Sequence, residues 1–248
     1  MTNAAIDTIV LVGTQRSGTT WIMQVLKQET SFNVFGEVFR EIRSPEFKGD
    51  PALKPDLFYL EYKDKYNDSS SINYVKKVLA EDQKITVFKV MYDQVRRNTG
   101  LLKLLASPNV LVINVERKNI FEMALSKCIA YKTGIYHAEK ELTYDGFHLK
   151  YRTIYSRLWK ESIKKRIFPS LIRLFSKNYS YFVYEDLVKD FSILEAEIKG
   201  YLNIQSLTLD SSSTKWKKTS KTNKYSAILN FDDITTRLKS SIFKGYVK

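Results

Sequence analysis

Cysteine and histidine are scarce in this chain. It has one cysteine, Cys128, and two histidines, His137 and His148, among 248 residues. A lone cysteine excludes an internal disulfide and any metal site that needs several cysteines, and two histidines leave little for zinc binding or histidine-based catalysis. Nine glycines and five prolines are too few for a low-complexity chain, and the composition is that of an ordinary globular protein.

Long hydrophobic runs are also missing. The apolar run Ile9–Val12 is stopped by Gly13, Gln15 and Arg16, far short of the roughly 20 residues that a membrane-spanning helix needs. No basic region precedes that run, so it does not have the pattern of a signal peptide. We therefore expect no membrane span, and the single cysteine favours a reducing, cytoplasmic location.

Acidic residues are outnumbered by basic ones. There are 40 Lys and Arg against 27 Asp and Glu, a formal net charge of +13. Such a balance favours an anionic partner, which could be a nucleic acid, a membrane surface, or a phosphorylated or sulfated small molecule.

Strand-like and helix-like segments alternate along the sequence. Short β-branched apolar runs predict buried strands, and the segments between them have apolar residues at helical spacing. This alternation predicts an α/β fold, a sandwich with a central, mainly parallel sheet flanked by helices, in a single domain over residues 1–248. Residues 44–71 and 136–147 look irregular and are candidate acceptor-site loops. The expected strands are 6–12, 32–35, 85–90, 110–115 and 179–184, and the expected helices are 18–29, 72–79, 101–106, 119–131, 150–167, 190–202 and 232–242.

The strongest motif lies between the first predicted strand and the first predicted helix. Residues 13–21 read Gly-Thr-Gln-Arg-Ser-Gly-Thr-Thr-Trp. Backbone N–H groups of such a loop, together with the helix N-terminus, form a phosphate site. The two glycines have the spacing of the nucleotide triphosphate loop G-x-x-x-x-G-K-S/T, but Thr19 replaces its lysine and Arg16 is the basic residue. Strand 110–115 is followed by Glu116, not by an aspartate suited to magnesium. The loop therefore suggests a shorter anion, bound without metal; the alternative is a tight turn with no ligand.

This loop sequence resembles the 5′-phosphosulfate loop of sulfotransferases that use 3′-phosphoadenosine 5′-phosphosulfate (PAPS). The resemblance implies a P-loop-kinase-like α/β fold. It also implies that Arg16 contacts the bridging and leaving oxygens and that Trp21 stacks on the adenine, as in the cytosolic branch. The loop residues that would hold the 5′-phosphosulfate are Gln15, Arg16, Ser17, Gly18, Thr19 and Thr20.

The same resemblance implies a second phosphate site after strand 110–115. Arg117 and Ser126 would bind the 3′-phosphate, for which a guanidinium is well suited. Their spacing is nine residues, and together with Ala130 and a later Thr-Gly-x-Tyr it resembles the bacterial trehalose-sulfotransferase-like branch. The alternatives are a surface salt bridge for Arg117 and a helix hydroxyl bonded to a carbonyl for Ser126.

A late basic segment could close over that phosphate. Residues 215–224 contain five lysines and no acid, and Lys218 and Lys221 are the candidates. The alternative is a solvated basic loop or a contact to nucleic acid.

Sulfuryl transfer also needs a base and a cation near the transferred group. The resemblance to carbohydrate-acting branches makes Glu37, just after the second strand, the candidate base, with Glu41 second and the two histidines weaker alternatives. Lys89 resembles the family's lysine near the sulfonate. Glu37 could instead be a helix N-terminal charge, and Lys89 a lysine extending from a strand end to solvent.

These observations predict a sulfotransferase that moves a sulfuryl group from PAPS to a hydroxyl of a carbohydrate or another hydroxylated metabolite, including a glycolipid. Two alternatives are a nucleotide kinase of the same fold and a nucleic-acid-binding module that uses the basic helix over 160–177. The oligomeric state stays open.

Overall fold

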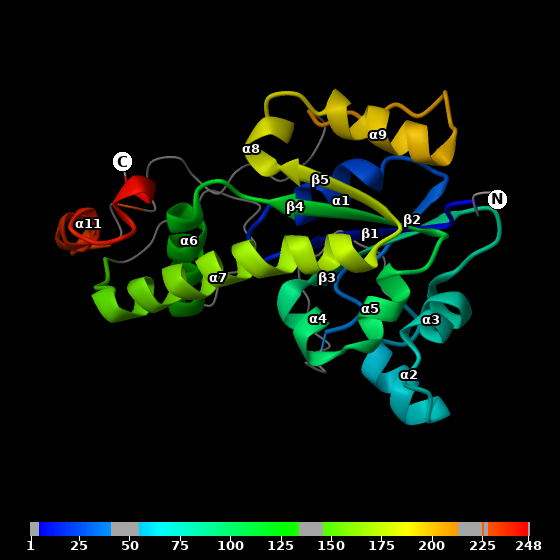
Figure 1. Cartoon of the computed structure of the whole chain (residues 1–248), viewed down its shortest axis with the longest axis horizontal. Coiled ribbons are helices and arrows are strands. Elements are labelled where there is room, and N and C mark those ends of the chain that lie inside the picture. The colour runs from blue at the N-terminus through cyan, green and yellow to red at the C-terminus, as the bar shows by residue number, and fades with distance from the viewer. Residues whose placement is uncertain (1–4, 41–54, 134–145, 213–224, 226–227, 248) are drawn as a thin grey trace. The chain divides into compact units, whose positions relative to one another are not determined.

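The computed structural model describes residues 5–40, 55–133, 146–212, 225 and 228–247. Its centre is a five-stranded sheet in the order β2-β3-β1-β4-β5, and every neighbouring pair in it is parallel (Figure 1). The strands are β1 (Thr8–Gly13), β2 (Phe32–Val34), β3 (Ile85–Met91), β4 (Val110–Glu116) and β5 (Asn178–Val183). The predicted α/β fold with a central parallel sheet is confirmed.

Helices cover both faces of this sheet, which explains why β1 and β4 are buried along their whole length. Figure 1 shows α1, α8 and α9 on one face and α2 to α5 on the other. Alternate residues of β1 enter the two cores: Ile9 and Leu11 pack with α1 and α9, whereas Val10 and Val12 pack with the opposite layer. The helices of this part are α1 (Thr19–Leu26), α2 (Tyr59–Tyr66), α3 (Ser71–Tyr74), α4 (Tyr92–Arg97), α5 (Gly100–Leu105), α8 (Tyr184–Leu187) and α9 (Ser192–Leu202), with a π-helical turn at Val75–Leu79.

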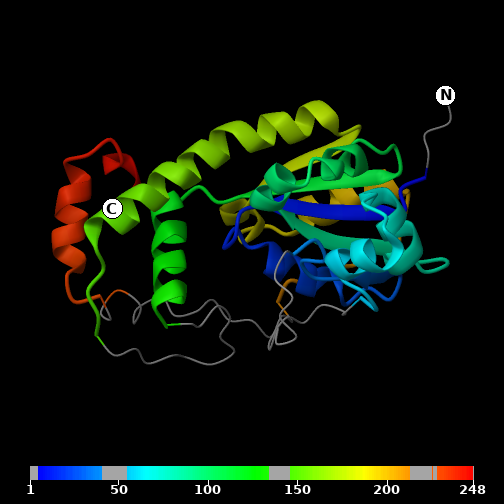
Figure 2. The same ribbon diagram turned by 90° about the horizontal axis from the view of Figure 1, so that it is seen from below.

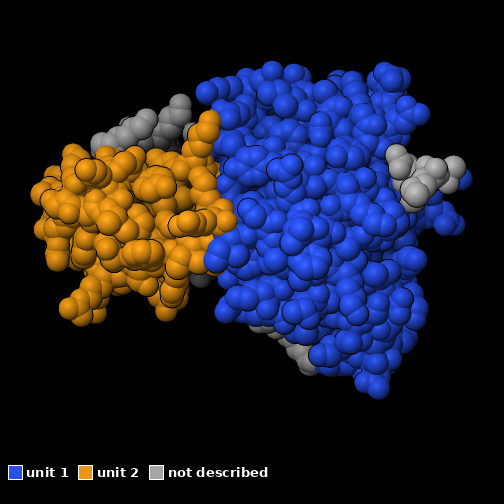
Figure 3. Space-filling view, in the orientation of Figure 1, with its two compact units in different colours: residues 1–116, 167–214 blue, residues 117–166, 215–248 orange. Residues whose placement is uncertain are grey.

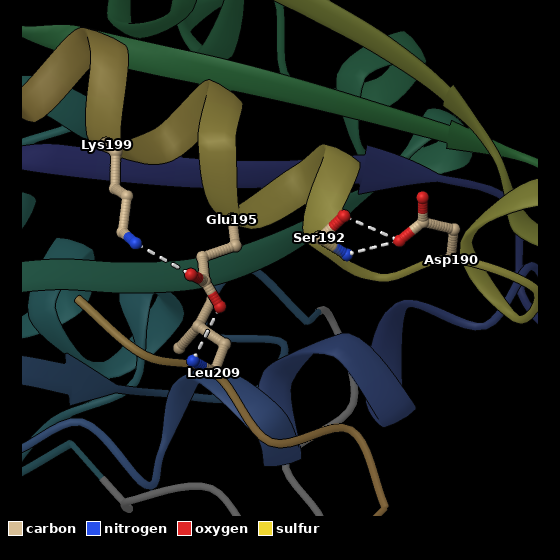
Figure 4. A network of polar contacts seen from close by, with 5 residues as sticks. All are labelled: Asp190, Ser192, Glu195, Lys199 and Leu209. Atoms are coloured by element: carbon tan, nitrogen blue, oxygen red, sulfur yellow. Dashed lines mark hydrogen bonds and ion pairs between the residues drawn. The ribbon is translucent and has the colours of Figure 1, made fainter.

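Helix α9 is anchored by a small polar network (Figure 4). Asp190 accepts hydrogen bonds from the backbone N–H and the hydroxyl of Ser192, at 3.0 and 2.6 Å. Glu195 accepts from Lys199 Nζ and from the Leu209 backbone N–H, both at 2.8 Å. The hydrogen bond from Lys199 is the main reason that the pKa of the Glu195 carboxyl lies below its ordinary value. This network ties the helix to the segment that follows it.

The described residues fall into two compact units (Figure 3). Unit 1 comprises residues 1–116 and 167–214 and holds the sheet; unit 2 comprises residues 117–166 and 215–248. The prediction of a single domain over 1–248 stays a prediction.

Unit 2 has its own apolar cluster, which draws on α6 (Ile120–Thr133), α7 (Tyr151–Phe175), α11 (Phe231–Lys239) and a 3-10 turn at Lys244–Tyr246. It also holds an ion pair between Lys127 Nζ and Glu161 Oε1 at 2.7 Å, with both side chains at most 7% exposed.

Two segments differ from their prediction. The helix expected over 150–167 continues to Phe175, as one long helix in Figure 2, with Pro169 inside it. Ile172, beyond the proline, is fully buried in the core, so packing outweighs the hydrogen bond that the proline removes. The segment 44–71, expected to be irregular, contains α2 because Tyr59 and Tyr62 pack into the core one turn apart.

Candidate functional site

The phosphate loop (residues 13–20) makes a tight turn between β1 and α1. Arg16 and Gly18 both have left-handed backbone conformations, with φ of 70° and 95°. The Ser17 N–H donates to the Thr14 carbonyl at 3.2 Å, and the Gly18 carbonyl accepts from the N–H groups of Trp21 and Ile22. The Gly18 conformation is one that glycine adopts without steric cost.

Both glycines of the loop are also required by close contacts. A Cβ on Gly13 would lie 2.7 Å from the Val115 carbonyl oxygen, and a Cβ on Gly18 would lie 2.1 Å from a ring carbon of Tyr184. The loop is therefore shaped by β4 on one side and by the first residue of α8 on the other.

The residues of the loop fit an anion. The N–H groups of the first turn of α1, at Thr19 and Thr20, have no acceptor within their own helix and carry the positive end of its dipole. The Ser17 hydroxyl is buried and has no hydrogen-bond partner among the described residues. Such N–H groups and hydroxyls suit a phosphate.

Three of the predicted site residues meet at this loop. Lys89 Nζ donates to Thr20 Oγ1 at 3.1 Å and lies 3.5 Å from Glu37 Oε1. The Lys89 side chain is only 2% exposed and the Glu37 side chain 17%. Because a buried ammonium needs a compensating partner, Glu37 and Thr20 together account for a lysine inside the sheet.

Strand pairing explains how these side chains are brought together. Lys89 lies beside Leu11 of β1, two residues before the loop begins. On the other side of β3, the residues that follow β2 stay hydrogen-bonded to β3. Phe35 N–H donates to the Val87 carbonyl, and Lys89 N–H donates to the Gly36 carbonyl. Glu37 therefore follows directly on a residue bonded to Lys89. Lys89 is an internal residue of the strand, and its side chain is buried rather than extended to solvent.

Trp21 packs by edge contacts against Tyr184 and Phe191, with ring centroids 5.8 and 5.1 Å apart. It is half-buried at the border of the core formed with α9. Its stacking on an adenine stays a prediction.

The second predicted phosphate site lies in the other unit. Arg117 follows β4 directly, its carbonyl accepts from Lys165 Nζ at 3.4 Å, and Asn119 Oδ1 accepts from the Glu122 N–H at the start of α6. Ser126 is half-buried on α6. Because the phosphate loop belongs to unit 1 and these residues to unit 2, their convergence on one ligand stays a prediction.

Several candidates lie outside the described residues: Glu41, His137, Lys218 and Lys221. His148 is described and is exposed in unit 2. No group of three or more His, Cys, Asp or Glu that could hold a metal is found among the described residues, and no helix within them is long and apolar enough to cross a membrane.

Sequence reasoning missed a polar network beneath the sheet edge. The Tyr92 hydroxyl donates to Asn114 Oδ1 at 2.7 Å, and Asn114 Nδ2 donates to the Tyr179 hydroxyl at 2.9 Å. Burial raises the pKa of both tyrosines, so both are neutral at ordinary pH. The Tyr179 hydroxyl, which accepts from Asn114, donates in turn to the Pro169 carbonyl at 3.4 Å. The available signal was an asparagine within the apolar run 110–115.

No protein-family model matches the chain, and no curated protein matches it. Among solved structures, a sulfotransferase from Alicyclobacillus acidocaldarius is 13% identical over 96% of this chain and 95% of its own, with a TM-score of 0.49. Sulfotransferase STF1 from Mycobacterium tuberculosis is 14% identical over 96% of this chain and 78% of its own, with a TM-score of 0.48. The mouse sulfotransferase SULT7A1, solved with PAP (PAPS without its sulfuryl group), is 14% identical over 99% of this chain and 91% of its own, with a TM-score of 0.44.

All three of these proteins are sulfotransferases by name. Likeness at this level of identity and TM-score assigns no activity, cofactor or acceptor to this chain.

Proposed function

We propose that this protein is a sulfotransferase that transfers a sulfuryl group from PAPS to an acceptor hydroxyl. The observation that carries the proposal is the contact of one buried ammonium, that of Lys89, with both Thr20 of the phosphate loop and the carboxylate of Glu37. A cation and a carboxylate beside an anion-binding loop are the two groups that sulfuryl transfer needs.

In the proposed reaction, PAPS supplies the activated sulfuryl group. Glu37 takes the proton from the acceptor hydroxyl while the oxygen of that hydroxyl attacks sulfur. The bond between sulfur and the phosphate oxygen breaks, and the electron pair stays on that oxygen, giving PAP. Lys89 and Arg16 stabilise the negative charge that builds up on the leaving oxygen.

The remaining predicted residues complete the proposed cofactor site. Arg117 and Ser126 bind the 3′-phosphate and Trp21 packs on the adenine, while Lys218 and Lys221 close over the 3′-phosphate. The acceptor is a carbohydrate or another hydroxylated metabolite, or a glycolipid. This is supported by the position of Glu37 and the Thr-Gly-x-Tyr at 133–136, which resemble the carbohydrate-acting branches.

A nucleotide kinase of the same fold is disfavoured by the loop itself. Position 19 is threonine, where a triphosphate loop has the lysine that reaches the β- and γ-phosphates.

Ligand-dependent melting separates these functions. PAP at about 100 times its dissociation constant should stabilise the chain by about 2.7 kcal/mol, without magnesium. Adenosine 5′-phosphosulfate, which lacks the 3′-phosphate, should stabilise it much less, and Arg117→Ala should erase that difference. Equal stabilisation of the native chain by both ligands would contradict the second phosphate site. Stabilisation by ATP with magnesium and not by PAP would contradict the proposed function.

A further inference from the structure

The positive charge of this chain is concentrated in unit 2. The sequence ranges of unit 2 contain 21 Lys and Arg against 7 Asp and Glu, a balance of +14, whereas those of unit 1 contain 19 against 20, a balance of −1. The phosphate loop, Lys89 and Glu37 all belong to unit 1, so most of the excess charge lies in the unit that does not hold them. The basic residues of unit 2 that the proposed function assigns to the 3′-phosphate are Arg117, Lys218 and Lys221, which are three of its 21, so binding PAPS leaves most of this charge unaccounted for.

Large apolar side chains are exposed on unit 2 among these basic residues. On α7, Trp159 is 44% exposed and Ile163, one turn further on, is 48% exposed. Ile242, just before the terminal 3-10 turn, is 66% exposed. The Trp159 ring lies edge-on against Phe243, with centroids 5.9 Å apart, so the exposed part of α7 and the residue next to Ile242 are in contact.

Basic side chains accompany these apolar ones. Lys160 and Arg166 are exposed on α7, and Lys244 is exposed two residues after Ile242. The one acidic residue of α7, Glu161, is turned inward and paired with Lys127. We call this set the docking face: Trp159, Lys160, Ile163, Arg166, Ile242 and Lys244.

We propose that unit 2 docks on an anionic membrane surface through the docking face. Exposed Trp and Ile side chains gain by insertion at the boundary between headgroups and acyl chains, and Lys and Arg beside them are attracted to anionic lipids. Their long aliphatic stems reach the headgroups while the apolar neighbours insert. This docking does not rest on the proposed transfer, and its test involves no turnover.

Charge and composition favour this occupant over two others. A second copy of the chain would bring two strongly positive faces together, which is repulsive. A nucleic acid would satisfy the basic residues, but the exposed isoleucines would gain nothing from its phosphates. A lipid surface satisfies both kinds of side chain.

The test is sedimentation of the full chain with vesicles. The vesicles are phosphatidylcholine alone, or phosphatidylcholine with about a quarter phosphatidylserine. We expect binding to the anionic vesicles only, with a clear loss of binding when salt is raised from about 0.05 M to about 0.3 M. Lys160→Gln with Lys244→Gln should weaken binding about 25-fold, since each basic side chain contributes about fivefold.

The apolar part has its own variants. Ile163→Gln with Ile242→Gln should weaken vesicle binding by a similar factor without altering the charge. The matched control is Val188→Gln with Ile193→Gln in unit 1, where both side chains are 49% exposed. The charge control is Lys76→Gln with Lys103→Gln, also exposed in unit 1. Both controls should bind as the native chain does.

Four results would overturn the proposal. They are no binding to either vesicle, equal binding to both, native binding by both docking-face variants, and loss of binding by the controls to the same extent. If the docking-face variants lost binding to a DNA duplex but not to vesicles, the face would be a nucleic-acid site instead. If they dissociated a dimer seen by size exclusion and left vesicle binding unchanged, the face would be an interface between copies.

Discussion

Replacing Glu37 by glutamine is the sharpest perturbation of the candidate site. The amide keeps the size of the side chain and can still accept a hydrogen bond from Lys89, but it cannot take a proton from an acceptor. The change also removes the negative charge that lies 3.5 Å from the Lys89 ammonium. The hydrogen bond from that ammonium to Thr20 does not involve Glu37 and should remain. Chemistry, ligand binding and stability should therefore respond differently.

The sizes of these effects follow from the burial of the pair. Loss of a positioned base costs about 10²–10⁴-fold in turnover, which is roughly 3–5 kcal/mol of transition-state stabilisation. Breaking a fully buried ion pair costs about 3–5 kcal/mol of stability. Glu37 is 17% exposed and water can reach it, so we expect a smaller loss of about 1–2 kcal/mol for Glu37→Gln. Affinity for PAP should stay nearly unchanged or rise, because the ammonium beside the loop is no longer neutralised.

The assay measures transfer from labelled PAPS to a panel of hydroxylated acceptors, with PAP affinity and melting temperature on the same preparations. Lys89→Met provides the contrast: turnover and PAP affinity should both fall, since the cation is lost. Asp233→Asn is the matched control, because it breaks an exposed carboxylate–cation pair, at 3.9 Å from Arg237, in unit 2. It should leave transfer and PAP binding as in the native chain.

The pH dependence separates a base from a structural carboxylate. The acidic limb of turnover, which reports an ionised carboxylate, should vanish in Glu37→Gln and survive in Lys89→Met. Near-native turnover in Glu37→Gln would refute the reasoning and move the assignment to Glu41 or a histidine. A parallel fall of PAP affinity and melting temperature in Glu37→Gln would show that the carboxylate acts structurally.

Three further outcomes are expected from the fold. Gly18→Ala should lower the melting temperature and abolish stabilisation by PAP, because the new Cβ would overlap the Tyr184 ring; stabilisation equal to native would contradict this. Glu195→Gln should cost about 1 kcal/mol at pH 7. The pKa of Glu195 is lower in the folded than in the unfolded chain, so the stability difference between native and variant should be full above the unfolded pKa near 4.5 and disappear as pH falls through the folded pKa. Denaturant unfolding at several pH values measures this difference, and a difference that grew in acid would contradict the prediction. Lys127→Met should destabilise the chain by about 3–5 kcal/mol because Glu161 is left buried without its closest partner. Adding Glu161→Leu to Lys127→Met should recover most of that loss, measured by denaturant unfolding. A double variant no more stable than Lys127→Met would contradict this prediction.

The sheet and the loop could be predicted from the sequence because both have strong local signals. Strands 85–91 and 110–116 are mainly apolar runs, and the spacing of Gly13 and Gly18 predicted a loop between a strand and a helix. The close contacts with Val115 and Tyr184 that require both glycines are added by the structure. Lys89 was predicted as a site residue because it resembles the family's lysine near the sulfonate, and the structure adds that it is buried and bonded to Thr20.

What could not be predicted depends on contacts between distant segments. The division into units has no linker to signal it, because unit 2 is built from two separate stretches of chain. Helix α2 was missed since its packing depends on two tyrosines whose partners lie in other elements. The hydrogen bond from Tyr92 to Asn114 joins the first residue of α4 to the middle of β4, and no local sequence pattern reveals such a contact.

The construction of unit 2 from two stretches also sets an order of events during synthesis. Its apolar cluster joins Ile154 and Leu158 of α7 to Ile234, Leu238 and Phe243. The first stretch, 117–166, leaves the ribosome well before the second, and all five strands of the sheet are made in between or earlier. The sheet of unit 1 can therefore form while the apolar faces of α6 and α7 still lack α11. A ribosome stalled before residue 231 would hold a chain with a completed sheet and an unfinished second unit.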